Sequence, residues 1–505
     1  MTSNNFCHNL IFCLFEEIVR RKQDNLPTTL SCICYSYFQM LYNIGTLTNS
    51  TLFISGDRVQ IPGWISDARS QISASKNKAD ILKNMLFYGH IGFIKELYTD
   101  FDISSLKICN FGISDLKMNA TFIQQIMSWG GQHFSGKLDE ISKSKYSSNN
   151  EWGMPADTTL QGTDSASDKW TNLVVPTGNY LTDEGLPTID INADTTYHVQ
   201  NFLGKDWGSV RGFGIPLSNR DGIPDLGNYN SFEAGCNEQV NEILDMYANL
   251  DDRKKTIAEL FAGTSKTSVS TPGFWILIGI MMSQKYNQSI ELDLLMFFVI
   301  SSGLFDAGLA AWKIKAICEQ PNPINVIRTL FNGIQISSWN PLRKNTINGS
   351  EWLPFQDLTV VSPPYPCGVS DHTAFSIVAV RLLEWWFDSS KLYDPFKLVN
   401  LPNPQLISPI LNNQYKLFSC GEFCLDAGSS KIELGGHSPK NSIVLKYDLL
   451  DELCSDVCMA RIYAGVEWFE NQEFSHKLAE WVYDKVRSKI ENAFKIKSPY
   501  KQQYT

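Results

Sequence analysis

The sequence has few charged residues and no long apolar run. Charged residues make up 19% of the 505 residues, and 53 Asp and Glu against 43 Lys and Arg give a net charge of −10. This acidic balance argues against a general polyanion binder, so no nucleic-acid partner is expected. The most apolar stretches, Phe274–Met282 and Leu294–Ile300, are shorter than the roughly 20 residues of a membrane-spanning helix. No transmembrane segment is therefore expected.

The cysteines lack the spacing of a metal site or a disulfide framework. The chain has 12 of them, and the only close pairs are Cys32/Cys34, Cys420/Cys424 and Cys454/Cys458. None of these is a CxxC pair, so neither a zinc ribbon nor a compact disulfide scaffold is predicted. The N-terminal apolar run Leu10–Phe15 is followed at once by charged residues, without the cleavage site of a signal peptide. These absences favour a cytoplasmic protein with reduced thiols.

What the sequence does contain is helical periodicity. Hydrophobic residues make up 43% of the chain and aromatic residues 12%, as in a folded globular protein. Apolar residues three and four positions apart predict helices, over the ranges 8–46 with a break near Pro27, 78–100, 113–130, 235–263, 272–286, 290–319, 324–334, 373–387, 449–466 and 473–494. Alternating runs are rare, with short candidates at Leu358–Val361 and Ser442–Leu445. The fold is predicted to be mainly α.

One long stretch, residues 142–235, differs from the rest in composition. It is dense in Asn, Asp, Gly, Ser, Thr and Pro, which are residues typical of turns and loops. A loop-rich segment of this length is usually functional or an interaction surface, so it is a candidate for homo-oligomer or partner contacts. Trp152, Trp170 and Trp207 predict that it packs on the rest of the protein.

Three segments place polar residues in apolar helical surroundings. The first runs from Phe305-Asp306 through Lys315 to Asn322-Pro323. The second contains Val369-Ser370-Asp371-His372 and opens directly into a predicted helix. The third starts at Ala460-Arg461 and reaches Glu467 after five further residues.

These segments resemble the three signature blocks of the vanadium-dependent haloperoxidases and the type 2 phosphatidic acid phosphatases. The family pattern is Lys, six residues and Arg-Pro; then Pro-Ser-Gly-His; then Ser-Arg, five residues and His. Order and spacing agree, and the resemblance extends from the first helices to about Val486. It implies two helical bundles of the vanadium haloperoxidase type with long loop insertions. The corresponding division is an N-terminal bundle (1–141), a loop-rich segment packing on the bundles (142–235), a C-terminal bundle carrying the site (236–494) and a tail (495–505).

The resemblance also implies roles for single residues. In the family, Lys, two Arg, a Ser hydroxyl and a backbone N–H hold vanadate or phosphate at a helix start, which is an anion site in physical terms. One His is the acid/base, and the other binds vanadium or attacks phosphorus. The matching positions are Lys315, Asn322, Ser370, Asp371 and Arg461 for the anion, His372 for the acid/base, and Glu467 for the ligand or nucleophile.

Three of these positions depart from the family pattern. Asn322 stands in place of an Arg, Asp371 in place of the Gly, and Glu467 in place of the ligand His. A complete site carries about +3 from one Lys and two Arg, whereas Lys315 and Arg461 here face two carboxylates. Because carboxylates repel an oxyanion, we predict a degenerate, catalytically inactive site with a structural or binding role. In this site the two cations form buried ion pairs with Asp371 and Glu467.

Other interpretations remain open at the level of sequence. The chain is either this pseudoenzyme or an active vanadium-dependent haloperoxidase (an oxidoreductase) or phosphohydrolase with a modified site, in which Glu467 replaces the nucleophile. A third interpretation is a site repurposed for a divalent cation, since Asp371, His372 and Glu467 offer O, N and O donors. Independently of any family, Ser370 is most simply a helix N-cap and His372 a hydrogen-bonded core residue.

Overall fold

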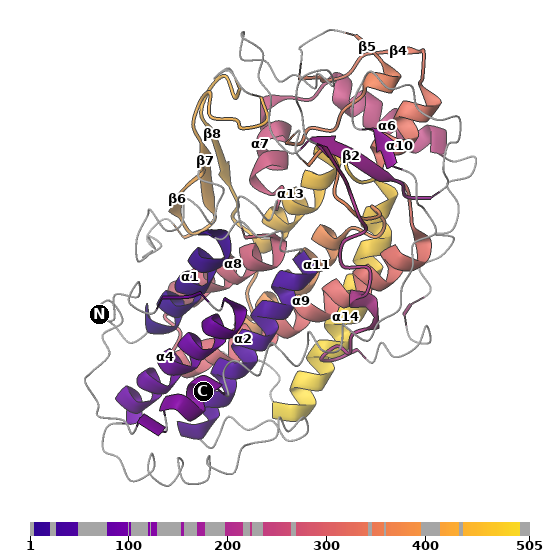
Figure 1. Cartoon of the computed structure of the whole chain (residues 1–505). Coiled ribbons are helices and arrows are strands. Elements are labelled where there is room, and N and C mark those ends of the chain that lie inside the picture. The colour runs from indigo at the N-terminus through magenta and orange to yellow at the C-terminus, as the bar shows by residue number, and fades with distance from the viewer. Residues whose placement is uncertain are drawn as a thin grey trace.

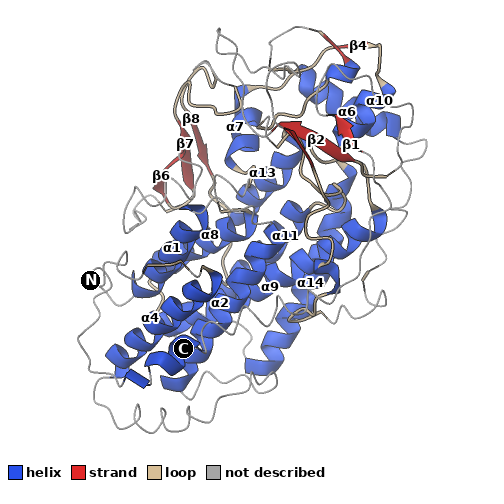
Figure 2. Ribbon diagram, in the orientation of Figure 1, coloured by secondary structure: helices blue, strands red, loops and turns tan. Residues whose placement is uncertain are grey.

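The structure of the chain, a computed structural model, describes residues 5–20, 27–48, 78–98, 100–102, 120–121, 123–128, 153–155, 169–176, 197–215, 223–224, 236–263, 269–341, 346–357, 360–394, 415–433 and 438–494. Helices dominate these residues, and the strands are short (Figure 2). The predicted mainly α fold is confirmed. None of the cysteines whose side chains are described forms a disulfide.

The N-terminal helices form where the apolar periodicity predicts them. They are α1 (Asn5–Arg20), α2 (Pro27–Thr48) and α4 (Lys78–Leu97). Pro27 is the first residue of α2, a position where its missing N–H costs no helical hydrogen bond. Residues 120–121 and 123–128 are helical, and the remainder of the predicted helix over 113–130 lies outside the described residues.

Helix α9 (Ile290–Cys318) is the central element of the fold (Figure 1). Ser289 caps it by accepting the Leu292 N–H, and Glu291 and Asp293 in its first turn favour the positive end of the helix dipole. It packs against α2 and against the later helices α11 (Asp371–Phe387) and α14 (Glu470–Phe494). By length and composition the stretch Ile290–Leu330 could cross a membrane, yet its most apolar window is completely buried inside the protein. The apolar surface of α9 is therefore used as core.

Five further helices complete the described residues, and of these α8 (Thr271–Lys285) packs against α9. The others are α6 (Cys236–Ala248), α7 (Asp252–Leu260), α10 (Pro323–Leu330) and α13 (Leu450–Tyr463). The single helix predicted over 235–263 is in fact α6 and α7. Asp251 separates them because its side chain accepts the Lys254 N–H and so starts a new helix.

Among the described residues, the strands form three small sheets that the sequence predicts only in part. Strands β1 (Gly153–Pro155), β2 (Asn172–Pro176) and β3 (Tyr197–Val199) pair within the segment predicted as loop-rich, β1 with β2 in parallel and β2 with β3 antiparallel. The antiparallel sheet β6 (Tyr415–Ser419), β7 (Glu422–Leu425) and β8 (Ile443–Lys446) includes the predicted strand at Ser442–Leu445. Two-residue strands β4 (Gln335–Ile336) and β5 (Ile347–Asn348) form a third sheet. In the predicted strand Leu358–Val361, Val360 and Val361 form a turn and a bend, while Leu358 and Thr359 lie outside the described residues.

Residues 197–215 cross α9 and hold the loop that precedes α11. Trp170 and Trp207 are buried, as predicted, whereas Trp152 lies outside the described residues. Gly208 lies so close to α9 that a Cβ would be 2.6 Å from the Cα of Lys313. Gln200 donates to the Ser362 carbonyl at 2.8 Å, and the Leu203 N–H donates to the Pro364 carbonyl at 3.0 Å. This part of the segment thus positions the second signature block.

Two apolar clusters meet at the predicted site. The larger joins α1, α2 and α4 to α8, α9, α11 and α14, and it includes Val369 and Ala374. The smaller is built around α6, α7 and α10, and it includes Ile462 and Val466 of the third block. Because the blocks contribute to both clusters, their polar residues are enclosed on both sides. The predicted division at 141, 235 and 494 stays a prediction.

Candidate functional site

The structure brings the three signature blocks together in the interior. Lys315 lies in the last turn of α9, and Asn322 immediately precedes α10. Ser370, Asp371 and His372 form the start of α11, and Arg461 lies near the end of α13. Glu467 follows in the connection to α14. Every one of these side chains is at most 3% exposed, so any chemistry here takes place away from bulk water.

Lys315 is held by groups of the protein itself. Its ammonium donates to the carbonyl oxygens of Pro366 at 2.8 Å and Cys367 at 3.2 Å. It also lies 3.4 Å from the Asp371 Oδ1 and 5.0 Å from the centre of the Tyr365 ring. Two of its three N–H donors are used by the carbonyls, and its charge is paired with the Asp371 carboxylate. Little donor capacity is left for an external oxyanion.

Asn322 holds the loop before α11 instead of facing an anion. Its Nδ2 donates to the Ser362 hydroxyl at 2.9 Å and lies near the Pro363 and Tyr365 carbonyls at 3.3 and 3.4 Å. Its Oδ1 has no hydrogen-bond partner within the described residues. The Arg that the family has at this position can bind an anion through two N–H groups of a charged guanidinium. A neutral amide engaged in this way cannot replace it.

The helix start at Ser370 is closed by internal hydrogen bonds. The Ser370 hydroxyl accepts the Thr373 N–H at 3.2 Å, which is the N-cap role predicted from the sequence. The backbone N–H of Ser370 donates to the Ser475 hydroxyl of α14 at 2.8 Å. The Ser370 backbone N–H is therefore already engaged, whereas the hydroxyl uses only a lone pair in its bond to Thr373.

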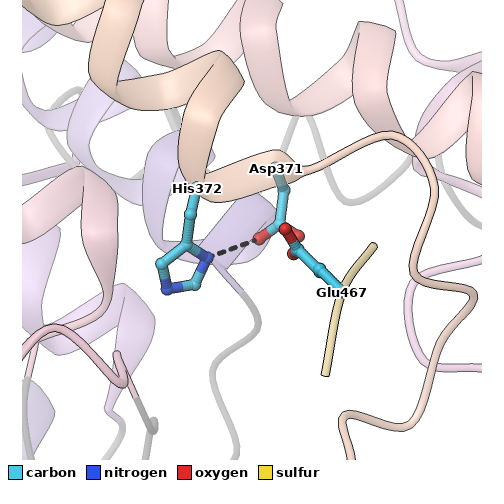
Figure 3. A group of neighbouring side chains, drawn as sticks. All are labelled: Asp371, His372 and Glu467. Atoms are coloured by element: carbon cyan, nitrogen blue, oxygen red, sulfur yellow. Dashed lines mark ion pairs between the residues drawn. The ribbon is translucent and has the colours of Figure 1, made fainter. Parts of the chain in front are cut away.

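Asp371 and His372 lie side by side at the first turn of α11 (Figure 3). The Asp371 Oδ2 is 3.4 Å from the His372 Nδ1, and its Oδ1 faces Lys315. Burial raises the pKa of Asp371, but Lys315, His372 and Arg461 outweigh this effect and leave the pKa below its usual value. Asp371 is therefore a charged carboxylate. Neither ring nitrogen of His372 has a hydrogen-bond partner within the described residues.

Arg461 and Glu467 form a second buried ion pair. The Arg461 Nε is 3.4 Å from the Glu467 Oε1. Burial and the nearby Asp371 raise the pKa of Glu467, against the lowering effect of Arg461 and Lys315. For Arg461, Tyr365, Glu467 and Asp371 raise the pKa against the effect of burial, so the guanidinium is charged. Each cation of the site thus faces a carboxyl group of the chain, Lys315 facing Asp371 and Arg461 facing Glu467.

Three contacts to the site are not visible in the blocks themselves. Tyr365 lies under Lys315, Ser475 receives the Ser370 N–H, and Gly263 approaches the His372 Nε2 so closely that a Cβ would be 3.1 Å from it. Ser475 lies in the amphipathic helix α14. Nothing in the sequence distinguishes it from a residue that only packs against neighbouring helices. The Pro363–Pro366 run that contains Tyr365 is the one signal that could have located this ring.

One domain family matches part of the chain. Residues 295–495 match the VCPO second helical-bundle domain, where VCPO denotes vanadium chloroperoxidase. Residues 295–495 include every signature residue discussed above.

This match over less than half of the chain supports the vanadium haloperoxidase superfamily.

The fold agrees over almost the whole chain. A holo-type bacterial vanadium-dependent chloroperoxidase superposes with a TM-score of 0.66 at 16% identity, covering 92% of each chain. The apo-type enzyme gives 0.65 at 16% identity, with 93% of this chain and 95% of that chain covered. A bacterial vanadium-dependent iodoperoxidase gives 0.56 at 14% identity over 96% of each. No curated protein sequence is detectably similar to the chain.

Proposed function

We propose that this haloperoxidase-fold protein does not hold vanadate or phosphate at the signature site and has a binding or structural role instead. One observation carries the proposal: the two cations of the site, Lys315 and Arg461, are each paired with a carboxylate of the chain, at 3.4 Å in both cases. The anion's place in the charge balance is taken by Asp371 and Glu467.

The energetics support this assignment. Two unit charges about 4 Å apart at an effective dielectric near 20 interact with about 4 kcal/mol. Two carboxylates therefore oppose a multiply charged oxyanion by several kcal/mol, and removing them from their partners would leave buried charges unpaired. Vanadate does not fit these residues, because its equatorial oxygens would meet the Asp371 and Glu467 oxygens and the amide of Asn322 in place of a guanidinium. No catalytic step through vanadate follows for this chain.

Activity assays test the proposal directly. The purified chain is incubated with vanadate, bromide and peroxide while bromination of a phenolic dye is followed, and separately with a phosphomonoester. We expect no turnover above that of His372→Ala in either assay. Turnover by the wild type that His372→Ala abolishes would contradict the proposal, because it would show that the modified site is an active one.

A reversion experiment tests the physical cause. The combined variant Asn322→Arg, Asp371→Gly and Glu467→His restores the family residues, and we expect it to bind vanadate at least about 100-fold more tightly than the wild type, since two opposing charges are removed and one cation is added. Equilibrium dialysis with vanadate measures this. The matched control keeps Glu467 and reverts only the other two positions, and it should recover a smaller part of the affinity. Equal binding by wild type and triple variant would argue against charge as the cause.

A further inference from the structure

In each of the two carboxylates of the site, one oxygen faces a cation and the other does not. Asp371 directs Oδ1 to Lys315 and Oδ2 to the His372 ring, both at 3.4 Å. Glu467 directs Oε1 to Arg461, while its Oε2 has no hydrogen-bond partner within the described residues. Figure 3 shows the Glu467 carboxylate directed at that of Asp371, with the imidazole beside them. One donor atom from each of the three residues lies within 4.8 Å of the other two.

These donor atoms are buried, and several of them have no hydrogen-bond partner among the described residues. Asp371, His372 and Glu467 are at most 1% exposed, and neither oxygen of Asp371 and neither nitrogen of His372 receives or makes a hydrogen bond in the described part of the chain. Native proteins leave few such groups, because each unsatisfied buried polar atom costs about 1–3 kcal/mol. Across the described ranges, the two nitrogens of His372 and the Glu467 Oε2 lack even an ion-pair partner other than Asp371, and their place beside the Asp371 carboxylate favours a ligand there.

We propose that Asp371, His372 and Glu467 bind a divalent first-row metal ion, of the Zn²⁺ or Mn²⁺ type. The proposal rests on the proposed function, because an oxyanion at the same place would exclude a cation. In the proposed binding role, the ligand is then a metal cation, in place of the anion that the family site holds.

The donor set and its spacing select this class of ion. An imidazole nitrogen together with two carboxylate oxygens suits first-row dications better than Ca²⁺ or Mg²⁺, which prefer oxygen alone. Zinc bonds to N and O are about 2.0–2.1 Å long, so two donors at a tetrahedral site are roughly 3.4 Å apart. The His372 Nδ1 and the Asp371 Oδ2 already have this separation. The Glu467 carboxylate, with a donor atom within 4.8 Å of the other two, would complete the set by moving closer to them.

Lys315 and Arg461 act as outer-shell donors in this arrangement. Ligating carboxylates are commonly held by hydrogen bonds on the side away from the metal, which fixes their orientation. The Asp371 Oδ1 faces Lys315 and the Glu467 Oε1 faces Arg461 in this way. The Lys315 ammonium also donates hydrogen bonds to the Pro366 and Cys367 carbonyls. Its charge therefore remains stabilised when the Asp371 carboxylate binds the metal.

Metal binding by the full-length chain tests the proposal. The protein is stripped with a chelator, then titrated with Zn²⁺ and with Mn²⁺ in competition with a chromophoric chelator, and the bound metal is measured after desalting. We expect one ion per chain. Glu467→Gln keeps the size of the side chain and removes its charge, and it should weaken binding at least about 100-fold, as should His372→Ala. His476→Ala on α14, outside the site, should change it less than about twofold.

Thermal unfolding separates loss of binding from loss of fold. Zn²⁺ should raise the midpoint of the wild type and of His476→Ala but not that of Glu467→Gln, because only a ligand of the folded state stabilises it. A folded wild type that takes up neither ion, or a Glu467→Gln variant that binds as tightly as the wild type, would overturn the proposal. The proposed function would survive that result, since it fails only if the metal-free protein turns over bromide or phosphoester.

Discussion

Gly465 is the residue on which the third block most depends. Its φ of +69° is strained for any other residue, and a Cβ there would be 2.2 Å from the Tyr247 hydroxyl and 3.0 Å from Trp352. We expect Gly465→Ala to lower the free energy of unfolding by at least about 3 kcal/mol, since the rings cannot withdraw from a packed core. Denaturant titration measures this.

Gly333 provides the matched control at the same scale. Its φ is +79°, but nothing lies within 4 Å of the position that a Cβ would take. Gly333→Ala should therefore cost only the backbone strain, about 1 kcal/mol. Equal losses of unfolding free energy for the two substitutions would show that the short distance to Tyr247 does not explain the destabilisation by Gly465→Ala.

Single site residues could be located from the sequence where they belong to a contiguous block. Lys315, His372 and Arg461 could be found because spacing along the chain identifies them, and the pairing of charges followed from residue types. Ser475 could not, because its contact with the Ser370 N–H depends on how α14 packs against the start of α11. The backbone partners of Lys315 were equally hidden, since carbonyl groups carry no sequence signal.

At the scale of elements, the crossing of α9 and α11 depends on Gly303. A Cβ at this position would be 2.4 Å from the Leu382 Cδ1 and 2.7 Å from the Val378 Cγ1, so the glycine lets the two helices approach closely. We expect Gly303→Ala to destabilise the protein by about 1–3 kcal/mol, because overpacking outweighs the better helix propensity of alanine. Thermal or denaturant unfolding measures the change.

Gly279 of α8 is the comparison within another helix. A Cβ there would be no closer than 3.2 Å to any atom outside its own turn, and the nearest atoms belong to the side chains of Phe297 and Ile300. Gly279→Ala should be clearly less destabilising than Gly303→Ala, since helix propensity then offsets the contact. A larger loss at Gly279 than at Gly303 would contradict close α9–α11 packing as the reason for the glycine.

Long helices were predictable and short strands were not, for one physical reason. The apolar repeat of α9 or α14 is a local property that persists over many residues. Strands of three residues such as β1 and β3 contain too little sequence to show alternation, and their pairing joins residues far apart in the chain. Asp251 shows the opposite case, because its capping hydrogen bond is local but is easily overlooked inside a continuous periodic pattern.

At the scale of the whole molecule, Asp306 links α9 to two distant parts of the chain. Its fully buried carboxylate accepts the N–H groups of Phe213 and Gly214, both at 2.6 Å, and of Ile215 at 3.1 Å. Lys489 of α14 donates to the Phe213 carbonyl at 2.7 Å. The central helix, the crossing segment 197–215 and the last helix are therefore joined at one carboxylate, on the same α9 that carries Lys315.

This junction makes the stability of the protein depend on pH. Burial raises the pKa of Asp306 to about 7, although the three N–H groups and Lys489 lower it. The folded state then holds the proton more tightly than the unfolded state, whose pKa is near 3.8. The stabilisation from protonated Asp306 is complete below about pH 4 and is lost as the pH rises through 7, a change on the order of 4 kcal/mol. Asp306→Asn removes this titration, so the difference in unfolding free energy between wild type and variant should shrink from pH 5 to pH 8. Urea titrations at the two pH values measure it, and a difference that stays constant would show that Asp306 is ionised throughout.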